Sequence, residues 1–170
     1  MKNPVLSRRN LVGNILGLSA GFLVASCSQY IPEGATPPAA LSRATMLAQI
    51  NATRAANGRK PLSYNPILGR AATTHARLMA SRGELSHTLG GSLRERVTAA
   101  GYRGAVGENL AGGQRTLELA IKGWLESPAH RSTLLNDRFN EFGLAVASGG
   151  GAHKIYWAMI LGGSFAAWQS

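Results

Sequence analysis

Two apolar stretches near the end of the chain decide the fold, Phe142-Gly143-Leu144-Ala145-Val146-Ala147 and Ile155-Tyr156-Trp157-Ala158-Met159-Ile160. Short runs rich in β-branched and aromatic residues are typical of buried strands. The glycine-rich residues 148–152 between the two stretches predict the turn of a hairpin. We therefore expect a pair of antiparallel strands at the C-terminal end of the domain.

The residues before this hairpin carry apolar side chains at helical spacing. Each long segment opens with a serine, threonine or asparagine, the residue types that cap helix N-termini. The expected helical segments are 42–57, 65–83, 92–100, 116–125 and, after a break at Ser127-Pro128, 128–135. Helices segregated from an antiparallel sheet predict an α+β layered domain.

Composition limits the chain to one ordinary domain. It has 170 residues, of which 45% are hydrophobic and 15% charged, so it can bury a core. Its single cysteine excludes an internal disulfide framework, a Cys-x-x-Cys redox pair and a cysteine-rich zinc site.

Residues 1–26 have the pattern of an export signal. Lys2, Arg8 and Arg9 precede an apolar run over residues 11–25. Fifteen helical residues cover only about 22 Å, less than the roughly 30 Å of a bilayer core, which favours a signal peptide over a membrane span. The adjacent Arg8 and Arg9 resemble a twin-arginine signal, and an ordinary secretory signal is the alternative.

The leader ends in Val24-Ala25-Ser26-Cys27, which resembles a bacterial lipobox. Cys27 is therefore expected to carry lipid, and a buried structural cysteine is the alternative. The proline-containing residues 27–41 indicate a tether and residues 42–165 the folded domain. These features predict a lipoprotein held on the outer side of a bacterial membrane, in the periplasm or at the cell surface.

Five blocks within the domain carry a family resemblance. They are Asn51-Ala52-Thr53-Arg54-Ala55-Ala56-Asn57-Gly58, Leu85-Ser86-His87-Thr88, Gly107-Glu108-Asn109-Leu110, Trp124-Leu125-Glu126-Ser127-Pro128-Ala129-His130-Arg131 and Phe139-Asn140-Glu141-Phe142-Gly143. In this order and spacing the chain resembles the CAP superfamily of cysteine-rich secretory, antigen 5 and pathogenesis-related proteins, in its cysteine-poor bacterial form. The resemblance implies a three-layer α-β-α sandwich with a small antiparallel sheet, and one further short strand near residues 108–111.

The resemblance also places His87 and Glu108 in a surface cleft. Imidazoles and a carboxylate in a cleft suit a divalent ion such as Zn²⁺, and they equally suit a general base with its orienting group. A hydrogen-bond network that only ties a loop to the sheet is the plain alternative. His130 borders the cleft in bacterial relatives, although it can instead pack against the Ser127 cap.

Three other residues are weaker candidates. Glu126 lies near the family's second acidic position, and an ordinary solvated glutamate is the alternative. His153 sits in the glycine-rich loop, where the chain departs from the family pattern, and His75 is expected to pack inside a helical layer. No residue is assigned a catalytic role, because neither a Gly-x-Ser-x-Gly elbow nor a His-Glu-x-x-His helix is present.

The charge suggests acidic neighbours. Removing the three basic residues of the leader leaves 15 basic and 8 acidic side chains, a net charge of +7. Anionic lipid headgroups or envelope polymers are the expected partners, nucleic acid is not, and a merely solvated basic surface is the alternative. Three functions follow: a non-catalytic binding module for a lipid-like or envelope ligand, a hydrolase of the peptidase kind using a cleft histidine, or a structural envelope protein.

Overall fold

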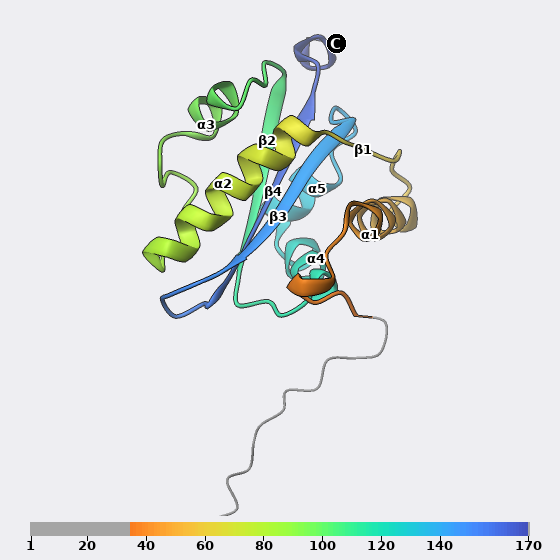
Figure 1. Ribbon diagram of the computed structural model, residues 1–170. Coiled ribbons are helices and arrows are strands. Elements are labelled where there is room, and N and C mark those ends of the chain that lie inside the picture. Colours follow the sequence, from red (N-terminus) through yellow and green to blue (C-terminus); the bar gives the residue numbers. More distant parts are fainter. Residues whose placement is uncertain (1–34, 170) are drawn as a thin grey trace, which may run out of the picture. The chain divides into compact units, whose positions relative to one another are not determined.

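The computed structural model describes residues 35–169 (Figure 1). The predicted export signal, with Arg8 and Arg9, and the predicted lipidation site Cys27 lie outside these residues. The elements in chain order are η1 (Pro38–Ala40), α1 (Arg43–Ala56), β1 (Ser63–Tyr64), α2 (Pro66–Arg82), α3 (Leu93–Ala99), β2 (Ala105–Gly112), α4 (Leu117–Glu126), α5 (Pro128–Leu134), β3 (Glu141–Ser148), β4 (Ile155–Gly163) and η2 (Phe165–Trp168). In the described part of the chain no helix is long and apolar enough to cross a bilayer.

The helices begin where their capping residues predict. The side chains of Ser42, Asn65, Ser92 and Thr116 each accept a hydrogen bond from a backbone N–H in the first turn of the helix that follows. These bonds satisfy donors that have no partner inside the helix. At the other end of α2, Gly83 adopts φ +68°, the left-handed conformation that closes many helices.

The four strands form one sheet in the order β1-β3-β4-β2. The predicted hairpin is present as β3 and β4, which pair antiparallel from Glu141–Gly162 to Ser148–Ile155. The strand that the resemblance implied near residues 108–111 is longer, because β2 pairs with β4 along its whole length. The sheet is not purely antiparallel: β1, which the sequence did not predict, adds two residues parallel to β3.

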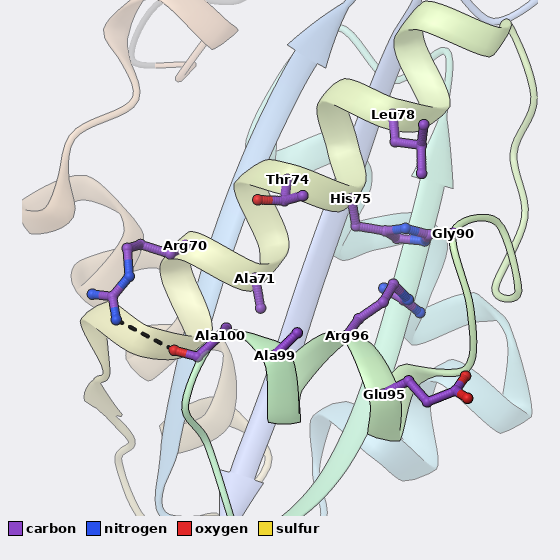
Figure 2. A pocket seen from close by; sticks show the side chains of 10 residues that line it. All are labelled: Arg70, Ala71, Thr74, His75, Leu78, Gly90, Glu95, Arg96, Ala99 and Ala100. Atoms are coloured by element: carbon purple, nitrogen blue, oxygen red, sulfur yellow. Dashed lines mark hydrogen bonds between the residues drawn. The ribbon is translucent and has the colours of Figure 1, made fainter.

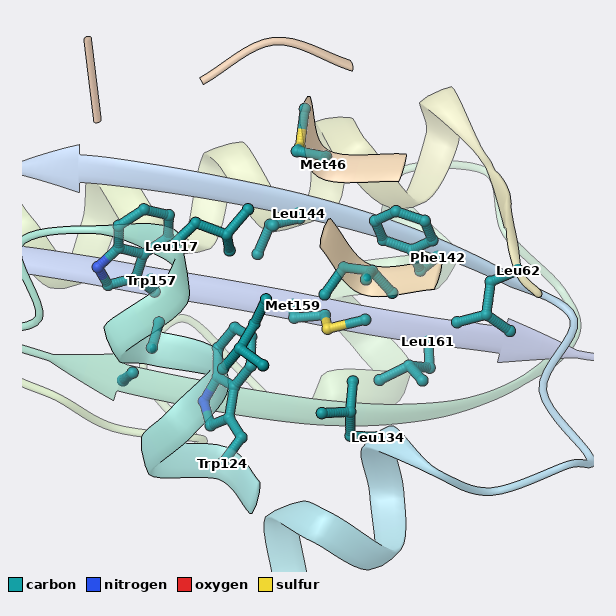
Figure 3. Close-up of a cluster of buried hydrophobic side chains, with 14 of the residues drawn as sticks. Met46, Leu62, Leu117, Trp124, Leu134, Phe142, Leu144, Trp157, Met159 and Leu161 are labelled. Carbon is teal, nitrogen blue, oxygen red and sulfur yellow. The ribbon is translucent and has the colours of Figure 1, made fainter. Parts of the chain in front are cut away.

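Helices cover both faces of the sheet, which confirms the three-layer α-β-α sandwich (Figure 1). Both faces of the sheet need cover because successive side chains of β4 point to opposite faces and are apolar on each. Trp157, Met159 and Leu161 pack with α1, α4 and α5 (Figure 3), whereas Tyr156, Ala158 and Ile160 pack with α2 and α3. Strand β4 is therefore buried on both faces. Strand β2, which carries Glu108, pairs with β4 and forms one edge of the sheet.

The residues just before α1 pack on the domain. Thr36 is buried, and its N–H donates to both carboxylate oxygens of Glu118 in α4 at 3.1 and 3.0 Å. Its carbonyl accepts from the Leu117 N–H at 3.0 Å. The stretch from Thr36 onward is thus attached to the start of α4, while the division between tether and domain at residue 42 stays a prediction.

Candidate functional site

His87 and Glu108 come together although they lie 21 positions apart in the sequence. His87 lies in the loop between α2 and α3, and Glu108 lies in β2. The His87 Nδ1 atom is 2.8 Å from Glu108 Oε2. The two side chains differ sharply in burial, because 56% of His87 is exposed and only 2% of Glu108. The pair therefore joins a buried carboxylate to an imidazole that faces solvent.

Arg96 of α3 holds the same carboxylate from the other side. Its Nη1 atom donates to Glu108 Oε1 at 2.9 Å and its Nη2 atom to Oε2 at 3.1 Å. Nη2 also donates to the His87 carbonyl at 2.9 Å, and Nε donates to the Gly91 carbonyl. Only 9% of the Arg96 side chain is exposed. One guanidinium thus ties α3, the His87 loop and β2 together through a forked pair of bonds.

Arg96 fixes the protonation pattern of its neighbours. Arginine is a donor only, so both Glu108 oxygens accept from it. An ionised carboxylate can only accept, so His87 must carry its proton on Nδ1. The Nε2 atom of a neutral His87 then presents a lone pair. The arrangement offers an exposed hydrogen-bond acceptor with a fixed tautomer.

His130 lies beside this pair. Its ring centroid is 6.5 Å from that of His87, with 23° between the ring planes. The Asn109 side-chain amide donates to the His130 carbonyl at 2.9 Å, which ties the start of α5 to β2 next to Glu108. Burial lowers the pKa of His130, and the charge of a protonated His87 lowers it further, so its ring favours the neutral form. We call His87, Arg96, Glu108 and His130 the His87 cluster.

One ring nitrogen of His130 lies within hydrogen-bond distance of a hydroxyl. Its Nδ1 atom is 2.9 Å from Ser127 Oγ. Ser127 occupies the N-cap position of α5, yet its side chain makes no capping bond to the backbone. His130 therefore does both things that the sequence left open: it contacts Ser127, and its ring lies beside that of His87.

Among the described residues, no hydrogen bond or ion pair connects the Glu126 side chain to the His87 cluster. Its side chain is 62% exposed and pairs with Lys122, one turn earlier in α4. That pairing is the ordinary i, i+4 arrangement of an exposed helix face. His153 is likewise exposed, and its ring lies edge-on to Tyr156 at 5.9 Å.

His75 is a buried packing residue, as its helical position predicts. It is 1% exposed in α2, and its Nε2 atom donates to the Ser86 carbonyl at 2.9 Å, because a carbonyl can only accept. Burial lowers the pKa of His75, which keeps the ring neutral. His75 thereby anchors the start of the loop that presents His87.

A cavity of about 560 Å³ opens between α2 and α3 (Figure 2). Arg96 forms part of its wall, so the cavity adjoins the His87 cluster. Ala71, Leu78, Ala99 and Ala100 contribute apolar surface, and Arg70 lies at one end with a bond to the Ala100 carbonyl. A cavity of this size is in the range of small-molecule sites.

Arg96 carries no distinguishing signal in the sequence. It is one of many arginines scattered through the helices, and the capping signal at Ser92 locates α3 without showing which arginine turns inward. A buried partner for Glu108 could be sought only among residues that the fold brings to β2. Tertiary structure supplies that information.

Comparisons with known proteins agree on one family. Residues 47–161 match the family model described as "CAP: Cysteine-rich secretory protein family". A curated relative, the uncharacterized protein YkwD of Bacillus subtilis (strain 168), is 33% identical over 104 residues. This match covers 59% of the chain and 40% of the relative, so the chain spans about two fifths of that protein's length.

Solved structures with the same fold include two bacterial proteins. One is an extracellular protein containing an SCP domain from Bacillus anthracis str. Ames, with a TM-score of 0.63 and 23% identity over 71% of this chain and 40% of that one. The other is an outer surface protein from Borrelia burgdorferi, with a TM-score of 0.63 and 21% identity over 71% of this chain and 91% of that one. At these identities the likeness concerns the fold.

Proposed function

Since the chain belongs to the cysteine-rich secretory protein (CAP) family, we propose that it is a lipid-anchored binding module of the bacterial cell envelope. Its ligand is lipid-like or an envelope component, with a hydrogen-bonding headgroup and an apolar body. The observation that carries this proposal is that Arg96 holds the His87 loop and also forms part of the wall of a largely apolar cavity, while 56% of the His87 side chain is exposed.

The location of the protein rests on its leader and on its relatives. Structural neighbours are described as extracellular or as an outer surface protein, which supports a place outside the cytoplasm. The Arg8-Arg9 signal and the lipobox at Cys27 add export and acylation to this proposal.

Lipid attachment at Cys27 is tested by metabolic labelling. Cells that express the chain and grow with radiolabelled palmitate are expected to label the protein, because acyl chains on Cys27 provide the membrane anchor. Cys27→Ala should abolish the label and release the protein from the membrane fraction. Unlabelled wild-type protein, or label that survives in Cys27→Ala, would remove the anchor from the proposal.

The chemistry of the His87 cluster selects the headgroup. The internal pair of Arg96 and Glu108 balances its own charge, and His130 favours the neutral form. The His87 ring is 56% exposed and its Nδ1 faces Glu108, so its Nε2 lone pair is the acceptor we assign to a donor such as a hydroxyl, amine or amide N–H. The apolar part of the ligand would then lie along Ala71, Leu78 and Ala99 in the cavity that Arg96 borders.

Replacement of His87 tests the binding proposal. Lipids that copurify with the full chain from its own envelope are to be extracted and quantified by mass spectrometry. His87→Ala is expected to bind the copurified species up to about tenfold more weakly and to retain correspondingly less of it, because one direct hydrogen bond contributes up to about 1.4 kcal/mol. His153→Ala removes another exposed histidine, outside the cluster, and should retain the wild-type amount.

Two other outcomes of this comparison would contradict binding at His87. Equal lipid content in all three proteins would place the ligand elsewhere, if it exists. Absence of any copurified species, together with a large loss of melting temperature in His87→Ala, would instead support a purely structural role for the cluster.

One contact favours a hydrolase as the second candidate. The 2.9 Å approach of Ser127 Oγ to His130 Nδ1 joins a hydroxyl to an imidazole whose pKa is lowered, which is the start of a nucleophile and base arrangement. Turnover of a peptide library by the wild type that is lost in Ser127→Ala would establish this candidate. Turnover that Ser127→Ala and His130→Ala leave unchanged would exclude both groups from catalysis.

A further inference from the structure

Donors from within the protein occupy three of the roughly four lone-pair positions of the Glu108 carboxylate. Oε1 accepts from Arg96, and Oε2 accepts from both Arg96 and His87, all within 3.1 Å. The carboxylate is 2% exposed, so solvent does not compete for it. A divalent ion such as Zn²⁺, which the imidazoles and carboxylate of the expected cleft would suit, would compete with these donors for the same carboxylate oxygens.

The charge at this position is also already balanced. The Arg96 guanidinium carries a permanent positive charge directly at Glu108, and its side chain is 9% exposed. A divalent cation at the carboxylate would lie next to that charge and would be repelled by it. Within residues 35–169 no group of three or more His, Cys, Asp or Glu side chains is arranged to hold a metal ion. The donor set therefore does not fit the expected metal.

We propose that Arg96 is a built-in counter-cation that takes the place of a metal at Glu108. It is a positioning residue: its forked bonds orient Glu108, and through Glu108 it holds His87 with Nδ1 facing the carboxylate. The His87 cluster then works by hydrogen bonding without a bound ion. This inference concerns the metal specificity of the cluster, and it holds whether or not a lipid-like ligand binds there.

Removal of the guanidinium charge provides a gain-of-function test. The full chain in detergent micelles is titrated with Co²⁺ alone, and its visible absorption reports coordination by protein ligands. Arg96→Gln keeps a polar side chain but lacks the charge, and it frees Glu108 Oε1. Its affinity for Co²⁺ is expected to exceed that of the wild type by about tenfold or more, the effect of removing one charge several ångströms from a divalent ion.

Three control variants test whether the gain in Co²⁺ affinity comes from the lost Arg96 charge and from the Glu108 carboxylate. Arg94→Gln changes a neighbouring arginine of α3 that lies over the Phe165 ring, away from Glu108, and should bind Co²⁺ as the wild type does. Arg96→Lys retains a positive charge and should show little gain. The double variant Arg96→Gln/Glu108→Gln should lose the gain, because the carboxylate is the ligand that the first substitution sets free.

Two results would overturn the proposal. The first is tight stoichiometric Co²⁺ binding by the wild type that His87→Ala abolishes. The second is a folded Arg96→Gln protein, with a cooperative melt, that binds Co²⁺ no better than the wild type. If Arg96→Gln does not fold, the wild type still decides: its His87 ring resonances should not shift when Zn²⁺ is added at equimolar concentration, and a shift there would contradict the proposal.

Discussion

Replacing Glu108 by alanine is expected to lower the free energy of unfolding by about 3–5 kcal/mol. The substitution leaves the Arg96 guanidinium nearly buried without its counter-charge, because Arg96 is 9% and Glu108 2% exposed. Removal of one partner from a buried ion pair costs far more than the pair contributes, since the remaining charge has lost its hydration. Urea denaturation followed by circular dichroism measures the loss.

Two comparisons make this prediction specific. His87→Ala removes the other partner of Glu108 but should cost less than about 1 kcal/mol, because the ring is 56% exposed and water replaces it. The double variant Arg96→Met/Glu108→Leu removes both buried charges and should recover much of the stability lost in Glu108→Ala. Small and equal losses in all variants would show that the carboxylate is not buried as described.

Gly143→Ala is expected to destabilise the domain by about 3 kcal/mol or more, because overpacking against backbone leaves little room for relaxation. Gly143 lies in β3 where α2 crosses the sheet, and a Cβ atom there would overlap the backbone of Leu68 and Gly69. Helix α2 would have to move away from the sheet. Thermal unfolding measures the shift in melting temperature.

A glycine elsewhere in the domain gives a control of opposite sign. Gly123 is in the interior of α4, and a Cβ atom there would meet nothing within 4 Å. Gly123→Ala should stabilise the protein by about 0.5–1 kcal/mol, since alanine loses less conformational entropy in a helix. Similar effects of the two substitutions would contradict the close approach of α2 to β3.

The layered fold was predictable because its signals are local. Ser42, Asn65, Ser92 and Thr116 mark helix starts through bonds to their own first turns. The hairpin follows from two apolar stretches around a glycine-rich turn. Strand β1 has no such signal, because its two residues become a strand only through parallel pairing with β3, which lies far along the chain.

The candidate site was predictable in part. The family motif blocks named His87, Glu108 and His130, and the structure brings the three together as a hydrogen-bonded pair with a neighbouring ring. Arg96 was not predicted, because an ion pair between a helix and a strand leaves no periodic pattern in sequence. Glu126 stands in the same motif block as His130, yet it faces Lys122 on the exposed side of α4, which its spacing alone did not reveal.

The nitrogen resonances of the histidine rings provide the most direct test that this cluster is an open hydrogen-bonding site. Long-range ¹H–¹⁵N correlation spectra of the full chain in micelles, at roughly pH 8 where an unperturbed imidazole is neutral, report each tautomer. We predict that His87 carries its proton on Nδ1, and that added envelope lipid shifts its Nε2 resonance while His153 stays unchanged. A His87 ring protonated on Nε2, or one that does not respond to lipid while other surfaces do, would contradict the account.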